Sequence, residues 1–506
     1  MKRLLKHLAL ALGYGALGVI VVGVLGYLRY LQGRPDLKPW HTARLDHEFR
    51  VGDRSAAVRF DQYLEQEERL FAELELEVNR RTPPQDQERW NRFWPGSDAD
   101  PSRNDTHWNR TFVLTPAAPR GGVLLLHGLS DGPYSLRALG QRLHAAGYLV
   151  IGLRLPGHGT APVGLTRATM EDFAAATRLA ARHLRERLGP RLPMHFVGYS
   201  NGGALAVEYA LARLEGEDLP AVDGLVLISP AIGVSPAAAL APVVRAVSRL
   251  PGLEKAAWTD IGPEYDPYKY NSFPVNAGDQ VYRLTRRIQE RLDRLDRGGG
   301  VSNLPPTLAF QSVVDATIVP TAIVDRLFRR LTPGPHELVL FDIRRTAIAT
   351  SLMVSRPEQF TQRLLADPLA PYSVRLLTTE GPDSDQVRVL FRAAGRTNIA
   401  ATAEDRRWPR GTMSLSHVAL PIPPGDPVYG DGSGAEPGRV HLGDLALHGE
   451  NGLLLVSPGI LLRLRYNPFY SFLEQRVMEF VSAVGGDGGT ERAPQSSGDR
   501  NTQEGR

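Results

Sequence analysis

Ser200 lies in the sequence Gly198-Tyr199-Ser200-Asn201-Gly202, which matches the pattern G-x-S-x-G. A buried-strand pattern ends at Tyr199 and a helical pattern follows at once, so the serine occupies a tight turn from a strand into a helix. In such a turn a side chain two residues before or after the serine would collide with neighbouring backbone, which glycine at 198 and 202 avoids. The pattern therefore predicts a nucleophile elbow, with the Ser200 hydroxyl exposed above a sheet at a helix N-terminus.

A nucleophilic serine needs backbone amides that stabilise the negative charge on the attacked oxygen. One predicted donor is the N–H of Asn201, which starts the helix after the elbow. The second is the N–H of Leu129, because His127-Gly128-Leu129 follows the apolar run Val123–Leu126 and precedes the elbow. An ordinary tight turn is the alternative, since His-Gly also recurs at 448–449 without such a setting.

A serine hydroxyl also needs a general base and a carboxylate that orients the base, in the chain order Ser, Asp, His for this architecture. Asp315 follows the strand-like run 307–314, on the same sheet edge as Ser200, and is the predicted acid. Asp342 is the alternative acid, but it lies within the strand-like run 337–343, where a salt bridge to Arg344 accounts for it.

Thirteen histidines compete for the role of base. His417 is the predicted base because it lies on a loop late in the chain. His336 begins a strand, at the wrong end for the site, and His441 and His448 lie in a later β-like segment. His158, in Pro-Gly-His-Gly, is expected to hydrogen-bond within its own turn. A Ser–His–Asp mechanism of this kind requires no metal and no organic cofactor.

Alternating strands and helices position these residues from Thr111 onward. The predicted strands are 123–127, 148–155, 194–199, 224–229, 307–314 and 337–343, and the predicted helices are 136–146, 170–188, 204–214 and 322–331. Buried strands that alternate with helices indicate a mostly parallel sheet covered by helices on both faces. The predicted fold class is therefore α/β.

Five short segments of the chain resemble the α/β-hydrolase superfamily, and within it the monoglyceride lipase / lysophospholipase-like (serine aminopeptidase S33-type) branch. They are LLLHGLSDGPYS (124–135), LRLPGHG (153–159), GYSNGG (198–203), Asp315 at a strand end, and SHVALP (416–421). The resemblance implies Ser200 as nucleophile, His417 as general base and Asp315 as its orienter. It also implies an oxyanion hole made by the amides of Leu129 and Asn201.

The chain departs from this family after Asp315. Asp315 and His417 are 102 positions apart, which predicts a β insertion at about 346–412, near the mouth of the site, with strand-like runs 372–378 and 387–392. After His417, a Pro/Gly-rich stretch and strand-like residues 453–464 precede a last predicted helix, 467–483.

Residues 232–303 interrupt the sheet where this family carries a cap. They contain a helix-like apolar run, 236–250, and an aromatic run, 265–273. The aromatic side chains are expected either to line an acyl-chain tunnel or to pack the cap onto the sheet.

Leu8–Leu28 is a run of 21 uncharged residues, which as a helix reaches about 30 Å, the thickness of a bilayer core. A cleaved signal peptide is the alternative, but residues 26–32 offer no small-x-small cleavage site. Three basic residues precede the run, which favours a cytoplasmic N-terminus and a catalytic domain outside the cytoplasm, facing the periplasm at a bacterial inner membrane.

The predicted division of the chain follows. Residues 1–28 are a tail and transmembrane anchor, 29–110 a membrane-proximal segment with a helix at 55–81, 111–484 the α/β-hydrolase domain, and 485–506 a disordered tail.

Composition excludes several other functions. The chain has no cysteine, so thiol chemistry and disulfides are excluded. The net charge is only +4, and the arginines are interleaved with acids, as in 287–297, which predicts a solvated helix face rather than a nucleic-acid surface. We therefore expect a membrane-anchored serine esterase acting on lipid-like esters such as monoacylglycerol or lysophospholipid. Acyl transfer, amide or peptide hydrolysis, and an inactive binding module are the alternatives.

Overall fold

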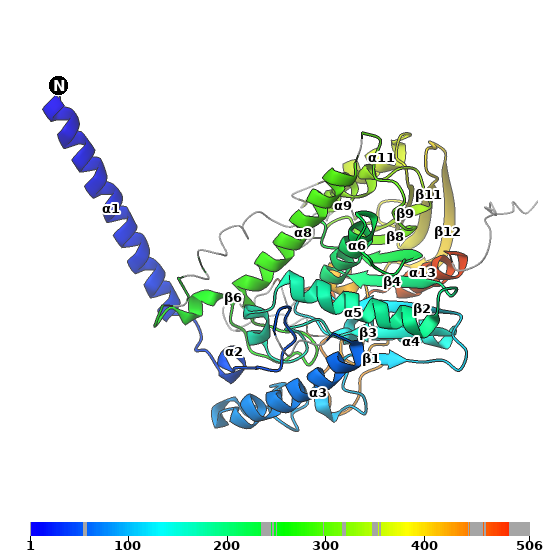
Figure 1. Ribbon diagram of the computed structural model, residues 1–506. Coiled ribbons are helices and arrows are strands. Elements are labelled where there is room, and N and C mark those ends of the chain that lie inside the picture. Colours follow the sequence, from blue (N-terminus) through cyan, green and yellow to red (C-terminus); the bar gives the residue numbers. More distant parts are fainter. Residues whose placement is uncertain are drawn as a thin grey trace, which may run out of the picture.

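One large sheet forms the centre of the computed structural model, which describes residues 2–53, 58–233, 250–296, 298–315, 320–346, 356–443 and 462–484 and a few single positions between them. Its strands are β1 (Phe112–Leu114), β2 (Gly121–Leu126), β3 (Tyr148–Leu153), β4 (Met194–Tyr199), β5 (Gly224–Ile228), β8 (Thr307–Ser312), β9 (His336–Phe341), β10 (Ser373–Thr379), β11 (Gln386–Arg392) and β12 (Ile399–Arg407). Their order is β1-β3-β2-β4-β5-β8-β9-β10-β11-β12 (Figure 1).

The strands from β3 to β10 in this order pair parallel, and β1, β11 and β12 pair antiparallel at the two sides. The predicted mostly parallel α/β sheet is therefore confirmed. The six predicted core strands all form, with their ends shifted by at most two residues. The crossover from β3 back across β2 to β4 leaves the carboxyl end of β4 near the middle of the sheet, where ligands bind in such folds.

Helices cover both faces of the sheet. On one face lie α4 (Arg137–Ala145) and α13 (Tyr470–Val484); on the other lie α5 (Met170–Leu188), α6 (Asn201–Leu214), α8 (Val275–Leu295), α9 (Pro320–Arg326) and α11 (Pro357–Ala366) (Figure 1). Alternate residues of each strand serve the two layers: Val123 and Leu125 pack with α4 and α13, and Leu124 and Leu126 pack with α5 and α6. This period of two explains why the core strands read as continuous apolar runs.

One prediction about α8 is wrong in part. The stretch 287–297 is not solvated throughout, because Arg291 is buried and donates hydrogen bonds to Glu208 at 3.2 Å and Glu217 at 2.7 Å. Glu208 lies on α6, which packs against α8, so the arginine faces a neighbouring helix that carries the compensating charge.

The described part of the predicted insertion 346–412 contains α11 and the strands β10 to β12. β10 pairs parallel with β9, with Val374 opposite Leu338, and β11 and β12 continue the sheet as antiparallel neighbours. These strands enlarge the main sheet at the side far from β1.

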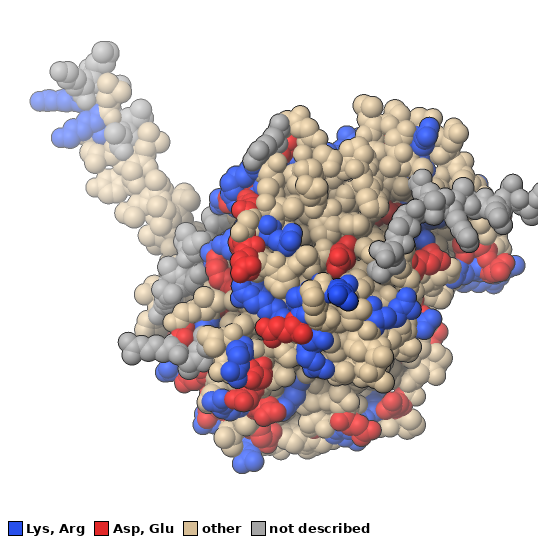
Figure 2. Space-filling view, turned by 45° about the vertical axis from the view of Figure 1, so that its right-hand side comes forward, with Lys and Arg blue, Asp and Glu red and all other residues tan. Residues whose placement is uncertain are grey.

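The N-terminal region has one projecting helix and two docked ones. The long helix α1 (Lys2–Gln32) extends away from the body (Figure 1), and its apolar part is not buried by the rest of the chain. Figure 2 shows an uncharged stretch of α1 between basic residues near its free end and the body. This length and composition suit a membrane span, and a signal sequence can have the same length and composition. The short α2 (Pro39–Thr42) and α3 (Phe60–Glu77) pack against the body through buried side chains such as Trp40 and Tyr63.

The region between β5 and β8 contains a second, small sheet made by β6 (Trp258–Asp260) and β7 (Phe273–Pro274), followed by α8. The predicted helix 236–250 and strands 453–464 lie almost entirely outside the described residues, and the predicted tail 485–506 lies wholly outside them.

Candidate active site

Ser200 sits at a strained turn between β4 and α6. Its φ of 53° lies in the left-handed region, which is costly for a residue other than glycine. The turn is held by β5, because the Ser200 N–H donates a hydrogen bond to Ile228 O at 2.9 Å. A Cβ atom on Gly198 would lie 2.4 Å from Gly202 O, and one on Gly202 would lie 2.0 Å from Leu126 O. The turn can therefore form only with glycine at both positions.

His417 and Asp315 lie together at the same edge of the sheet. Asp315 follows β8, and His417 begins a 3₁₀ turn, His417–Ala419. The distance between His417 Nδ1 and Asp315 Oδ1 is 3.5 Å, and both side chains are buried. The His417 ring also stacks near that of Tyr199, with 6.4 Å between centroids, which puts the imidazole beside the elbow. The structure thus brings His417 and Asp315 together and places the His417 ring beside Tyr199, the neighbour of Ser200 in the chain.

The second oxygen of Asp315 is oriented by polar neighbours. Asp315 Oδ2 accepts hydrogen bonds from Gln311 Nε2 at 3.2 Å and from Ser229 Oγ at 3.4 Å. These donors stabilise the ionised carboxylate and leave Oδ1 toward the imidazole. Gln311 lies on β8, and Ser229 lies just after β5. The sequence alone indicated neither residue, because polar positions at buried strand ends belong to no recognisable motif.

The alternative acid and bases have other partners. Asp342 pairs with Arg345 at 2.8 Å and accepts a hydrogen bond from Thr378 at 2.7 Å, so the expected salt bridge with Arg344 is wrong by one residue.

The alternative histidines also lie elsewhere. His336 starts β9, at the opposite end of the strand from the site. His441 Nδ1 lies 3.0 Å from Pro427 O, and His158 Nδ1 lies 2.9 Å from Pro156 O, within its own turn as expected. His448 lies outside the described residues.

The two predicted oxyanion donors flank the elbow. Asn201 is the first residue of α6, so its N–H has no acceptor within the helix and lies at the positive end of the helix dipole. Leu129 follows Gly128, where an added Cβ would lie 2.7 Å from the Tyr199 ring. The loop that carries Leu129 therefore passes directly against the elbow.

The His127 side chain holds this loop in place. Its Nε2 accepts a hydrogen bond from the Leu155 N–H at 3.0 Å, and its Nδ1 lies 2.8 Å from Gly128 O. Burial lowers the pKa of His127 well below its ordinary value, so the ring is neutral. A neutral ring that accepts at Nε2 carries its proton on Nδ1 and donates it to Gly128 O. His127 is thus a structural part of the predicted oxyanion loop, a role that the sequence alone did not assign to its side chain.

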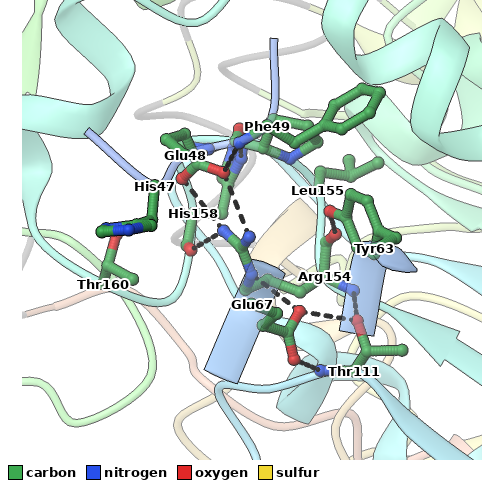
Figure 3. Close-up of polar contacts among 12 residues, drawn as sticks. His47, Glu48, Phe49, Tyr63, Glu67, Thr111, Arg154, Leu155, His158 and Thr160 are labelled. Carbon is green, nitrogen blue, oxygen red and sulfur yellow. Dashed lines mark hydrogen bonds and ion pairs between the residues drawn. The ribbon is translucent and has the colours of Figure 1, made fainter. Parts of the chain in front are cut away.

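Figure 3 shows a buried ion cluster that joins the N-terminal segment to the loop after β3. Arg154 donates to Glu48 at 3.1 Å, to Glu67 of α3 at 2.8 Å and to the carbonyl of His158 at 3.0 Å. Glu48 also accepts a hydrogen bond from the Gly157 N–H at 2.8 Å. The His158 ring in turn meets the His127 ring edge-on, with 4.9 Å between centroids. Glu48 and Glu67 therefore support the loop that backs the predicted oxyanion hole.

A cavity of about 150 Å³ adjoins the candidate triad. Tyr199, next to Ser200, and Val418, next to His417, contribute to its wall. The remaining lining residues are largely aromatic or charged, and include Tyr134, Tyr265, Tyr268, Tyr270, Asp131, Lys269, Arg463 and Arg465.

The tyrosines present their rings to this cavity. The Tyr134 hydroxyl donates to Asp426 at 2.9 Å and the Tyr270 hydroxyl donates to Gly157 O at 3.1 Å, so both hydroxyls have protein partners. Tyr268 stacks on Tyr134 with 3.7 Å between centroids. The aromatic run 265–273 therefore both packs the cap region and lines the cavity.

The central part of the chain is similar to known hydrolases. The protein-family model described as "Serine aminopeptidase, S33" matches residues 117–260. A thermostable monoacylglycerol lipase from Bacillus sp. (strain H-257) is 29% identical over 219 residues, which cover 43% of this chain and 79% of the relative. A monoacylglycerol lipase from Mycolicibacterium smegmatis is 34% identical over 154 residues, 28% of this chain and 50% of the relative. The crystal structure of Paleococcus ferrophilus monoacylglycerol lipase is 23% identical, with a TM-score of 0.34, over 46% of this chain and 88% of that one.

The matched family region includes β2 to β5, the His127 loop and the elbow. The predicted resemblance to this branch is therefore confirmed, although α1, α3 and the strands β10 to β12 lie outside the matched range. Together with the sheet topology, these similarities support an α/β-hydrolase of the monoglyceride lipase-like branch, and a carboxylic-ester hydrolase.

Proposed function

We propose that this protein is a membrane-anchored serine hydrolase that cleaves the ester of single-chain lipids such as monoacylglycerols or lysophospholipids. The observation that carries the proposal is the meeting of three groups at one sheet edge. These are Ser200 on its strained elbow, the His417 ring beside that elbow, and Asp315, 3.5 Å from the imidazole. The two monoacylglycerol lipases similar to the chain support the choice of a lipid ester.

In the proposed acylation step, Ser200 Oγ attacks the ester carbonyl carbon while His417 accepts the hydroxyl proton. Asp315 holds the imidazole in orientation and stabilises its positive charge. The carbonyl π electrons move to the oxygen, whose negative charge is stabilised by the N–H groups of Leu129 and Asn201. When the intermediate collapses, the carbon–oxygen bond of the ester breaks and the alcohol leaves with the proton from His417.

In the proposed deacylation step, a water molecule attacks the acyl-serine while His417 accepts one of its protons. The second tetrahedral intermediate uses the same two N–H groups, and its collapse returns the proton to Ser200 Oγ and releases the carboxylic acid. Both steps use only side chains and amides of this chain.

The anchor proposed is α1, with the catalytic domain on the outer side of the membrane. Support comes from its uncharged length and from the basic residues at its free end. Because the chain has no cysteine, a single cysteine placed in the catalytic domain can be labelled specifically. We expect Leu369→Cys, 87% exposed, to react with a membrane-impermeant maleimide on intact cells. Reaction only after lysis would contradict the proposed orientation.

A fluorophosphonate probe tests the proposed chemistry, because it phosphonylates only an activated serine. We expect the full-length chain in detergent to be labelled, Ser200→Ala to remove the label, and His417→Ala to slow labelling at least ~100-fold. The control is His441→Ala, which should be labelled at the rate of the unmodified chain. Labelling that survives Ser200→Ala would contradict the assignment of the nucleophile, and a requirement for His441 would contradict that of the base.

A further inference from the structure

The chain that leaves α1 is fastened to the region around the β6–β7 sheet. Arg34, two residues after α1, donates hydrogen bonds to the carbonyls of Lys255 and Thr259, both at 3.0 Å. Lys255 Nζ donates back to Arg34 O at 2.8 Å and pairs with Asp36 at 2.8 Å. Figure 1 shows this end of α1 beside β6, with α2 close by. The point where a membrane surface would meet the body is therefore set by these contacts.

A hollow of about 500 Å³ opens at this point. Its wall is formed chiefly by aromatic, proline and aliphatic side chains, namely Pro35, Trp40, Trp90, Ile261, Pro263 and Tyr265. We call this hollow, defined by those six residues, the anchor groove. Trp90 is 43% exposed, an unusual degree for so large an apolar surface in contact with water.

Of the charged residues that line the hollow, all but the exposed Glu88 have a side-chain partner among the described residues. Lys38 pairs with Asp86 at 2.8 Å, and Asp36 pairs with Lys255. Glu264 is buried and accepts a hydrogen bond from the Ser272 N–H at 2.8 Å. An occupant of the groove therefore meets mainly apolar surface, which suits a hydrocarbon chain better than a charged group.

Tyr265 joins the anchor groove to the catalytic cavity, because its side chain contributes to the walls of both. A hydrogen bond between the Tyr265 hydroxyl and Arg465 holds the ring in place, and Arg465 in turn lies 3.8 Å from Asp266. The Tyr265 ring thus stands between a hollow at the foot of the membrane helix and a cavity at the triad.

We propose that the anchor groove binds the acyl chain of an ester drawn from the membrane, and that Tyr265 is the gate between this groove and the catalytic cavity. The proposal rests on the proposed role of Ser200 as nucleophile, and it adds where the acyl chain lies. Pro35, Trp40 and Trp90 precede the range matched by the family model, and Ile261, Pro263 and Tyr265 follow it, so the site lies in segments that this match does not cover.

A photoreactive probe tests where the acyl chain lies. The probe is a fluorophosphonate with a long alkyl chain that ends in a diazirine, applied to the full-length chain in lipid vesicles. After attachment to Ser200 and irradiation, we expect mass spectrometry to find cross-links in peptides that contain residues 35–40, 90 or 261–263. A short-chain diazirine probe is the control and should cross-link only walls of the catalytic cavity, such as Tyr199 or Val418.

The outcomes of this experiment separate the two proposals. Labelling of Ser200 with long-chain cross-links confined to α8 or to residues 232–250 would overturn the anchor groove and leave the nucleophile intact. No labelling of Ser200 by either probe would instead overturn the proposed function.

Substitutions test the groove by kinetics. Trp90→Asp places a charge on the groove wall, and we expect it to lower kcat/KM for a long-chain ester in vesicles about 10-fold relative to a soluble butanoyl ester. The matched control is Leu369→Asp, an exposed apolar residue between α11 and β10, which should not change this ratio. An equal loss on both substrates for Trp90→Asp would contradict the groove.

A second substitution tests the gate. Tyr265→Phe keeps the ring and removes the hydrogen bond to Arg465, so the gate should open more readily. We expect the long-chain probe to label Ser200 about 3-fold faster relative to the short-chain probe. An unchanged ratio of labelling rates would contradict a gating role for Tyr265.

Discussion

Glycines 198 and 202 are the residues on which the conformation of Ser200 depends most directly. A serine keeps a left-handed backbone conformation only where its surroundings allow no other. Here backbone atoms lie close to both Gly198 and Gly202. The strained backbone of Ser200 therefore has a structural cause, namely the close approach of β2, β4 and the start of α6.

The first prediction concerns Gly202→Ala. The added methyl group would lie 2.0 Å from Leu126 O, which is backbone and cannot move aside without shifting β2 against α6. We expect kcat/KM to fall at least ~100-fold through displacement of the Ser200 hydroxyl, measured with a soluble ester. Gly381→Ala is the matched control, since nothing lies within 4 Å of its added methyl group, and it should retain full activity. Full activity of Gly202→Ala would mean that the elbow is not as tight as described.

The second prediction concerns His195, a buried histidine on β4 whose ring nitrogens have no hydrogen-bond partner among the described residues. Burial lowers its pKa to about 4, so it stays neutral in the fold but binds a proton on unfolding below its ordinary pKa of 6.5. Stability is therefore lost as pH falls from 6.5 toward 4, by about 2 kcal/mol for this residue at pH 5.

His195→Leu should remove this loss, because a leucine of similar volume neither titrates nor leaves a buried polar atom unsatisfied. We expect the difference in the free energy of unfolding between pH 7.5 and pH 5 to shrink by about 2 kcal/mol, measured by urea denaturation in detergent. The same difference in the variant and the unmodified chain would show that His195 is protonated in the fold.

At the scale of elements, α3 and the loop after β3 depend on one buried cluster. Glu67 of α3 accepts hydrogen bonds from the Thr111 N–H at 2.8 Å and from Arg154 Nε at 2.8 Å. Removing one partner of a buried ion pair leaves the other charge without compensation, which costs more than the pair itself contributes. The attachment of α3 to the hydrolase core is therefore sensitive to single side chains.

The third prediction is that Glu67→Gln lowers the free energy of unfolding by about 3 kcal/mol. The variant keeps the size of the side chain but leaves Arg154 with Glu48 as its only carboxylate partner in the cluster. Glu68→Gln, on the exposed side of the same helix, is the control and should change stability by less than ~0.5 kcal/mol. Equal stability of the two variants, measured by urea denaturation, would contradict a structural role for the cluster.

The elements that the sequence predicts well are those with a continuous apolar signal. The bounds of α5 and β4 are predicted to the residue, because their helical periodicity and their apolar run both end at clear turn residues. β12 has no such signal, since most of its side chains are exposed and its sequence neither alternates nor forms an apolar run. β12 is a strand because β11 offers it a free edge, and the local sequence of β12 does not indicate that pairing.

The site residues, too, could be predicted only where the local sequence carries a clear signal. Ser200, Asp315 and His417 could be proposed because each follows a recognisable strand or motif. Ser229, Arg154 and Glu48 could not, because their importance lies in partners distant along the chain: Ser229 meets Asp315 across 86 positions, and Arg154 meets Glu48 across 106. Buried polar clusters of this kind need the three-dimensional contacts before they can be recognised.

At the scale of the whole molecule, two of the segments outside the matched family region lie together, whereas α1 projects from the body and β10 to β12 extend the far side of the sheet. Residues before the sheet and after His417 contact each other: the Val440 N–H donates to Asp98 O at 3.1 Å, and Ala99, Tyr268 and Val428 share one apolar cluster. Mixed charges cover the face seen in Figure 2, without a large patch of one sign. These two segments thus pack against each other and against Tyr268, which lines the cavity near the candidate triad.

The fourth prediction concerns the contribution of the membrane to turnover. If α1 is replaced by a cleavable signal, the catalytic domain is released and loses the high effective concentration of lipid at the membrane surface. We expect turnover of a long-chain monoester in vesicles to fall about 10-fold, whereas turnover of a soluble short-chain p-nitrophenyl ester should stay within ~2-fold. Replacing α1 by an unrelated transmembrane helix, with Arg34 and its contacts retained, should restore the vesicle activity. Equal loss on both substrates would show that α1 supports the fold rather than the supply of substrate, and unchanged turnover of both would show that the catalytic domain takes its ester from solution.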